Sequence, residues 1–299
     1  MINTALYIGT ILIWGSTWLA IQYQVDSVNP VWSVAYRFAI ATIILFVYCF
    51  AKKLPMKFNK QEHLAILLQS ALIFSINYIL YYLGSAHLIS GYVAILGATI
   101  AIINIFNCRL FLNMPLNKKA LLGAIIGIAG LVVVFWQEFA SIKAGDMAFE
   151  TLAMAVFFCL LGTYVASLGN IVSKRNQDLN LPIVQTNAWG MLYGTLITAS
   201  IAAAFRLPMH IDFSFQYLFA LLYLSLFGSV IAFGLYLKLL GSIGPDRAAY
   251  LFVVTPIVAL ILSSFFEGFH WESSTIVGIL MILAGNTLVM SAPKPAPSA

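Results

Sequence analysis

Ten apolar segments, each long enough to cross a lipid bilayer as a helix, follow one another along this 299-residue chain. An α-helix needs about 20 apolar residues to span a hydrocarbon layer of roughly 30 Å, and it satisfies its own backbone polar groups there. The sequence therefore predicts an all-α integral membrane protein with spans at residues 3–23, 30–50, 64–84, 89–111, 119–136, 149–172, 183–204, 216–240, 247–267 and 274–291.

Charged residues are too few for a water-soluble fold. They make up 8% of the chain, against about 25% in soluble domains. The three cysteines lie inside predicted spans, and the four histidines lie singly near helix ends, so neither a disulfide framework nor a metal site is expected. An enzyme would need a nucleophile paired with a base, and the sequence offers no such pair. We expect no cofactor and no catalytic residue.

The basic residues predict the orientation in the membrane, because short cytoplasmic loops retain Lys and Arg. Placing both termini in the cytoplasm puts 12 of the 15 basic residues on that side. The net charge of +5 is spread over these loops, so it indicates topology and not nucleic-acid binding. We expect a multi-pass protein of the cell (inner or plasma) membrane that contacts the bilayer and a small-molecule substrate, as a monomer or homodimer.

Landmarks recur along the chain at nearly constant spacing, which indicates an internal duplication. Leu83-Gly84-Ser85 matches Leu240-Gly241-Ser242 at an offset of 157, and Pro30 matches Pro182 at an offset of 152. Five crossings are an odd number, so the second repeat must be inverted relative to the first. The alternative is chance similarity between apolar helices. The predicted organisation is two inverted five-helix repeats, 1–137 and 147–291, and a disordered tail, 292–299.

Short motifs carry a resemblance to a known family. They are Trp14-Gly15-Ser16-Thr17-Trp18 in the first span, Arg37-Phe38 in the second, and glycine-rich fifth and tenth spans. With ten spans in two halves, the chain resembles the EamA-like branch of the drug/metabolite transporter superfamily. That resemblance implies export of metabolites such as amino acids. The family usually has a proline midway through both the fourth and the ninth span. Here the ninth span has Pro256, a candidate hinge, but the fourth span has Thr99 at the equivalent position. Proline bends a helix, so the two halves are expected to flex unequally.

Polar side chains inside the spans are the candidate substrate-binding residues, because in hydrocarbon they need a partner or a water-lined cavity. The first and sixth spans carry polar stripes with a helical repeat, and the third span crowds an amide with tyrosines. Ser and Thr also serve as contacts between helices, which is the alternative for the stripes. The candidates are Trp14, Trp18, Asn77, Tyr78, Tyr81, Thr99, Tyr164, Ser167, Asn170 and Tyr250.

Arg37 is a further candidate, since it is a charge inside a span. It could bind a substrate carboxylate, or it could bond helix carbonyls as a structural residue. The structural interpretation is favoured, because the residue recurs in the family pattern whatever the substrate.

The charges that are missing narrow the function. No Asp or Glu lies at mid-depth of a span, which disfavours a proton-coupled exporter of cations, and few basic groups are available for a phosphorylated-metabolite exchanger. We expect a secondary transporter, in the direction of export, of neutral or zwitterionic metabolites by alternating access. The alternatives are an exporter of drug-like or purine- or nucleoside-like solutes, a phosphorylated-metabolite exchanger, or a passive channel.

Overall fold

The computed structural model describes residues 2–25, 27–112, 118–136, 149–243, 248 and 250–291. Within these residues the regular structure is entirely helical. The elements are α1 (Ile2–Val25), α2 (Pro30–Ala51), α3 (Lys60–Ala71), η1 (Leu72–Ile76), α4 (Asn77–Ser85), α5 (Ser90–Ala98), α6 (Ile100–Leu112), α7 (Lys118–Val134), α9 (Phe149–Asp178), α10 (Ile183–Ala204), α11 (Phe215–Tyr223), η2 (Leu224–Ile231), α12 (Ala232–Ile243), α14 (Tyr250–Phe266) and α15 (Ser273–Ser291).

These elements join into ten rods that match the ten predicted spans. The elements α3, η1 and α4 form one continuous rod, α11, η2 and α12 form another, and α5 and α6 are separated by a single residue. Six runs in the described residues are long and apolar enough to cross a membrane, and three more are shorter apolar helices. The predicted fold class, an all-α membrane protein of ten helices in two repeats, is confirmed.

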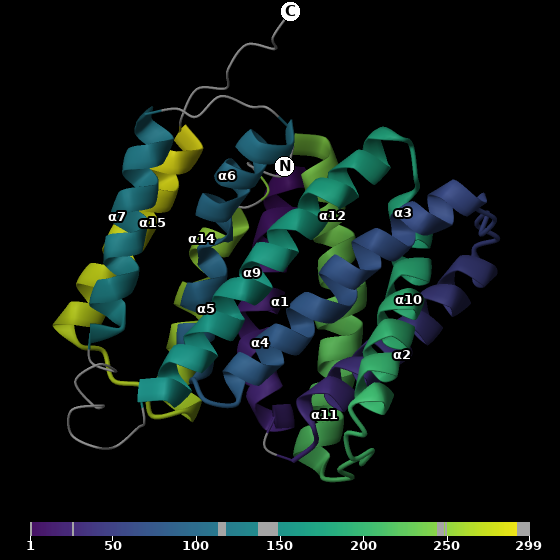
Figure 1. Cartoon of the computed structure of the whole chain (residues 1–299), viewed down its shortest axis with the longest axis horizontal. Helices are drawn as coiled ribbons and strands as arrows, with labels where there is room; N and C mark the ends of the chain where they lie inside the picture. Colours follow the sequence, from purple (N-terminus) through teal and green to yellow (C-terminus); the bar gives the residue numbers. More distant parts are fainter. Residues whose placement is uncertain are drawn as a thin grey trace, which may run out of the picture.

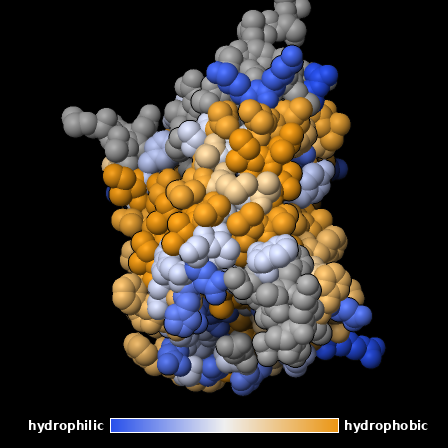
Figure 2. Space-filling model, turned by 90° about the vertical axis from the view of Figure 1, so that its left-hand side faces the viewer, coloured by the Kyte–Doolittle hydropathy of each residue, from blue (hydrophilic) through white to orange (hydrophobic). Residues whose placement is uncertain are grey.

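The rods pack side by side with α1, α4, α5, α9 and α12 toward the middle, and α7 with α15 at one side (Figure 1). Helix α1 begins and α15 ends at the same end of the bundle, which we call the termini end (Figure 1). Figure 2 shows apolar residues across the middle of one face and hydrophilic residues toward its two ends. This distribution is the one a lipid-facing surface requires.

A π-helix interrupts the third rod of each half. The first, η1, begins at Leu72, and the second, η2, begins at Leu224, so their starts are 152 residues apart, as are Pro30 and Pro182. Short π-helices are rare and often mark functional sites. The shared position adds a structural landmark to the sequence offsets and supports the duplication.

Glycines bring α7 and α15 into backbone contact. A Cβ added at Gly285 would lie 2.5 Å from the carbonyl oxygen of Gly123 and 2.6 Å from the nitrogen of Gly127. A Cβ at Gly130 would lie 2.7 Å from the carbonyl oxygen of Gly278. Small residues let membrane helices approach this closely. The glycine-rich fifth and tenth spans therefore hold the two repeats together.

At the end opposite the termini end, Glu267 ties α14 to the start of α5. Its carboxylate accepts hydrogen bonds from the Ser90 backbone N–H at 3.0 Å, from the Ser90 hydroxyl, and from the Ser263 hydroxyl at 2.6 Å. The Gly91 N–H also donates to the Ser263 hydroxyl, at 3.0 Å. A carboxylate at a helix N-terminus satisfies free N–H groups and the helix dipole. These contacts, which we call the Glu267 latch, hold the fourth and ninth rods together there.

Replacing Glu267 by Ala is expected to lower the stability of the purified protein by about 1 kcal/mol, the usual cost of losing a helix cap. Two hydrogen bonds to Ser90 at the start of α5 and one to Ser263 of α14 would be lost together. Thermal unfolding in detergent measures the change. The control is Glu272→Ala, which removes an exposed carboxylate five residues further along the chain. Equal midpoints for the two variants would show that the latch does not stabilise the fold.

Candidate functional site

A cavity of about 70 Å³ lies between the two repeats. Eight elements contribute to its wall, from α1, η1, α4, α5 and α6 of the first half and from α9, α12 and α14 of the second. A space enclosed by both halves is the arrangement expected when a solute site lies at a repeat interface. The lining residues are Trp14, Thr17, Trp18, Ile21, Ile73, Asn77, Tyr78, Tyr81, Ala94, Gly97, Ile100, Ala166, Asn170, Phe233, Tyr236, Phe252 and Thr255.

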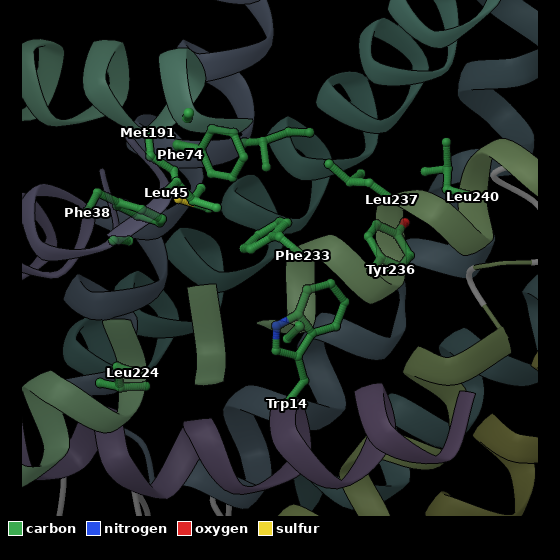
Figure 3. Packing of buried hydrophobic residues seen from close by; sticks show 14 of the residues in the cluster. Trp14, Phe38, Leu45, Phe74, Met191, Leu224, Phe233, Tyr236, Leu237 and Leu240 are labelled. Carbon is green, nitrogen blue, oxygen red and sulfur yellow. The ribbon is translucent and has the colours of Figure 1, made fainter. Parts of the chain in front are cut away.

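One wall of the cavity is an aromatic cluster around Trp14. Its ring centre lies 5.1 Å from that of Phe233, 4.9 Å from that of Tyr236, and 5.2 Å from that of Phe252. Figure 3 shows the indole pointing from α1 toward Phe233 and Tyr236. The indole N–H donates to the Gly228 carbonyl of η2 at 3.1 Å. Trp14 is 7% exposed, so it is a residue of the interior and not of an interfacial belt.

A second wall is built around Tyr81 of α4. Its ring meets that of Trp18 edge-on, with centres 5.1 Å apart, and its hydroxyl lies 2.9 Å from the hydroxyl of Thr163 on α9. A Cβ at Gly97 of α5 would lie 3.4 Å from the Trp18 ring and 3.5 Å from the Tyr81 hydroxyl. The absence of a side chain at Gly97 thus keeps this part of the cavity open.

Four polar atoms on lining residues have no hydrogen-bond partner. They are the indole nitrogen of Trp18, the amide oxygen of Asn77, the amide nitrogen of Asn170 and the hydroxyl of Tyr236. Buried polar groups are nearly always paired, and leaving one unpaired costs roughly 1–3 kcal/mol. Together they offer N–H and O–H donors and an amide acceptor. The cavity is therefore suited to a solute or waters that complete these bonds.

Six predicted candidates line the cavity: Trp14, Trp18, Asn77, Tyr78, Tyr81 and Asn170. Thr17, from the polar stripe of the first span, and Thr255, in the ninth span, line it too. Their common feature is a polar or aromatic side chain on the inward face of a middle rod. The side chain of Tyr250, a further candidate, lies outside the described residues.

Three other candidates lie away from the cavity wall. The Ser167 hydroxyl donates to Asn104 at 2.5 Å and accepts from Asn107 at 2.9 Å, so it joins α9 to α6. For Ser167 this agrees with the alternative interpretation of the polar stripe in the sixth span, in which Ser and Thr form contacts between helices. Tyr164 is 39% exposed, on an outer face of α9. The Thr99 hydroxyl donates to the Leu96 carbonyl at 2.6 Å.

Arg37 is buried behind the cavity and does not line it. Its Nε–H donates to the Ser229 hydroxyl at 2.9 Å, and its Nη1 lies 3.5 Å from the Tyr82 hydroxyl. The guanidinium carbon lies 4.6 Å from the centre of the Tyr78 ring. Tyr78 is itself a lining residue. The bonds to neighbouring helices agree with the structural interpretation, and one aromatic ring separates the charge from the cavity.

The two halves differ at the positions of Thr99 and Pro256. A proline usually interrupts a helix, but here the interruption is at the threonine. The rod of the fourth span is interrupted at Thr99, between α5 and α6, whereas α14 runs unbroken through Pro256. Pro256 has no N–H, so the Phe252 carbonyl lacks its usual partner four residues on. Phe252 lines the cavity. A hinge role for Pro256 stays a prediction.

Three aromatic lining residues, Phe233, Tyr236 and Phe252, were not among the candidates. They lie in apolar stretches where Phe and Tyr are equally typical of a lipid-facing surface. One signal was available: Phe233 follows Tyr81 by 152 residues, the offset of the two π-helices. The repeat thus relates two residues on the cavity wall.

A second, smaller cavity of about 10 Å³ lies between α3, α9, α10 and α12. Its polar lining includes Thr186 and Asn187, whose side-chain oxygens have no partner. Nearby, the Asn176 amide donates to the Gln69 side chain at 2.9 Å. A space of this size and polarity is suited to one water molecule.

Comparison with known proteins identifies the family. The model of the EamA-like transporter family matches twice, at residues 2–136 and at residues 153–291. The chain belongs to the EamA-like transporter family. It is therefore a multi-pass membrane transporter, and the family resemblance noted in the sequence is confirmed.

Individual relatives agree over nearly the full length. The chain is 25% identical to "Uncharacterized transporter YoaV" of Bacillus subtilis, covering 96% of this chain and 97% of that protein. It is 27% identical to "Uncharacterized inner membrane transporter YedA" of Escherichia coli K12, covering 98% and 93%. A solved crystal structure superposes with a TM-score of 0.70 at 16% identity, covering 96% of this chain and 95% of that one, which supports the fold alone.

Proposed function

We propose that this EamA-family protein is an exporter that carries small neutral or zwitterionic metabolites, with amino acids as the leading class, across the cell membrane. The observation that supports this most is the cavity between the repeats. Within the described residues its wall holds no charged side chain, and it combines an aromatic cluster with four unpaired polar atoms. Apolar pockets with a few placed polar groups are typical solute sites.

The cavity wall also separates this function from two alternatives. An exporter of organic cations needs a carboxylate at its site, and a phosphorylated-metabolite exchanger needs several cationic groups. Neither kind of group belongs to the described lining. Planar drug-like or nucleoside-like solutes remain the second candidate, because Trp14 and Phe252, whose rings stack on each other, both line the cavity.

Alternating access is the mechanism we propose, with both termini in the cytoplasm as the basic loops indicate. The Glu267 latch closes the rods α5 and α14 on each other at the end opposite the termini end. At that end the Gln22 amide also donates to the Leu88 carbonyl at 2.6 Å. In the proposed cycle these contacts separate when the cavity faces the outside, and the Thr99 interruption and Pro256 are candidate hinge points.

Uptake into proteoliposomes tests the function. Purified protein is reconstituted and offered a radiolabelled panel of amino acids, nucleosides, phosphorylated sugars and cationic dyes. We expect saturable uptake of at least one amino acid, with little or no uptake of the dyes or phosphorylated sugars. Saturable transport of nucleosides alone would favour the second candidate. Absence of transport across the whole panel would overturn the proposal.

The two cavity asparagines are expected to contribute to solute affinity. Asn77→Ala and Asn170→Ala should each raise the KM of the transported solute about fivefold, since each removes a hydrogen bond worth about 1 kcal/mol. Asn286→Ala is the matched control, because Asn286 is also buried with both amide atoms unpaired but lies on α15, away from the cavity. An equal KM for all three variants and the unmodified protein would contradict the cavity assignment.

A further inference from the structure

Arg37 carries a buried positive charge whose described partners are all neutral. It is 1% exposed, and its hydrogen bonds go to the hydroxyls of Ser229 and Tyr82. No carboxylate in the described part of the chain forms an ion pair with it. Burying a charge is expensive unless an opposite charge or several hydrogen bonds compensate it. Two hydroxyls and the Tyr78 ring leave most of its positive potential available to a nearby anion.

The geometry directs this potential at the cavity. The guanidinium lies 4.6 Å from the centre of the Tyr78 ring, and Tyr78 belongs to the cavity wall. An aromatic ring in a site with little water screens a charge far less than bulk solvent does. A negative group in the cavity next to Tyr78 would therefore be stabilised by Arg37 without touching it.

We propose that Arg37 makes the cavity selective for solutes that carry a carboxylate. This inference rests on the proposed function and names the group that the site recognises. The Trp18 N–H, the Asn170 amide and the Tyr236 hydroxyl are buried, unpaired donors on residues that line the cavity, and in the proposed complex they turn to bond the carboxylate oxygens. Arg37 acts as a specificity residue at longer range, and it disfavours cationic solutes by the same potential.

The π-helix η2 holds Arg37 in this place. The Ser229 hydroxyl, which accepts the Arg37 Nε–H, itself donates to the Leu224 carbonyl five residues earlier, at 3.0 Å. A Cβ at Gly228 would lie 3.0 Å from Arg37 Nη2, so glycine leaves room for the guanidinium. The Gly228 carbonyl in turn accepts the Trp14 indole N–H. The same turn of η2 thus fixes both the charge and the aromatic cluster of the cavity.

Matched pairs of solutes test the inference on the unmodified protein. The probes are L-leucine, L-phenylalanine and L-serine, each compared with its own carboxamide, as inhibitors of the uptake of a transported solute. For each amino acid that inhibits uptake, we expect the acid to inhibit about tenfold more strongly than its amide. This is on the order of the attraction between Arg37 and a carboxylate on the other side of the Tyr78 ring, at an effective dielectric constant of about 20. Amides that inhibit as strongly as the acids overturn the inference and leave the transporter proposal standing. Lack of inhibition by all six probes overturns the inference as well, and the proposed function is judged separately by the transport panel.

Substitutions then assign the selectivity to Arg37. Arg37→Gln should reduce the acid-to-amide ratio toward one without weakening inhibition by the amides, which are cations that Arg37 repels, and Arg37→Lys should keep the acid preferred. Equal loss of both acid and amide inhibition in folded Arg37→Gln would show a structural role alone. An unchanged ratio would likewise overturn the assignment. If Arg37→Gln does not fold, the Arg37→Lys ratio and the solute pairs on the unmodified protein decide.

Discussion

Gly97→Leu is expected to abolish transport in proteoliposomes while leaving the protein folded. A Cβ at Gly97 finds ordinary contacts, 3.4 Å from the Trp18 ring and 3.5 Å from the Tyr81 hydroxyl. The rest of a leucine side chain must then extend into a cavity of about 70 Å³. The solute and this side chain compete for the same space. Initial rates of uptake measure the effect, and the thermal midpoint reports the fold.

Gly234→Leu is the matched control for this variant. It places the same side chain on α12, where an added Cβ meets no atom within 4 Å and where the residue does not line the cavity. Uptake by Gly234→Leu should equal that of the unmodified protein. Normal uptake by folded Gly97→Leu would show that the solute does not pass through this cavity.

Gly285→Leu is expected to produce the largest loss of stability. The Cβ alone would lie 2.5 Å from the Gly123 carbonyl oxygen and 2.6 Å from the Gly127 nitrogen, and both are backbone atoms that no side-chain rotation can move away. Helices α7 and α15 must separate to accept it. Overpacking of this kind costs about 3 kcal/mol or more. The measurement is the thermal midpoint and the yield of monodisperse protein in detergent.

The control for Gly285→Leu is again Gly234→Leu, which tests an added leucine without a backbone clash. Its midpoint should stay near that of the unmodified protein. A midpoint for Gly285→Leu equal to that of the control would mean that the contact of α7 with α15 does not hold the fold together.

The rods of the fold were predictable from the sequence because hydropathy over about 20 residues is a direct requirement of the bilayer. The duplication was predictable from landmarks such as Pro30 and Pro182, whose offset the two π-helices share. The π-helices themselves were not predicted, since their residues have no composition that separates them from an α-helix. The interruption at Thr99 was not predicted either, because threonine is a far weaker signal than proline.

The candidate site was predicted in part, and the reason is geometric. Periodicity groups residues on one face of a helix, and Trp14 of the first stripe and Asn170 of the stripe in the sixth span both line the cavity. It does not say which neighbour that face meets. Ser167 shares the stripe with Asn170 but bonds Asn104 and Asn107 on α6. The Phe233 and Tyr236 rings needed the packing of α12 on α1, which no local pattern in the chain specifies.

Tracer counterflow tests the central claim, that one cavity between the two repeats carries a solute across the membrane. Proteoliposomes are loaded with an unlabelled amino acid that the panel shows to be transported, and the labelled form is added outside. The account predicts transient accumulation of label above equilibrium in liposomes with the unmodified protein, and none with Gly97→Leu. Uptake that only follows the gradient, rises linearly with concentration and is the same in both proteins would contradict it.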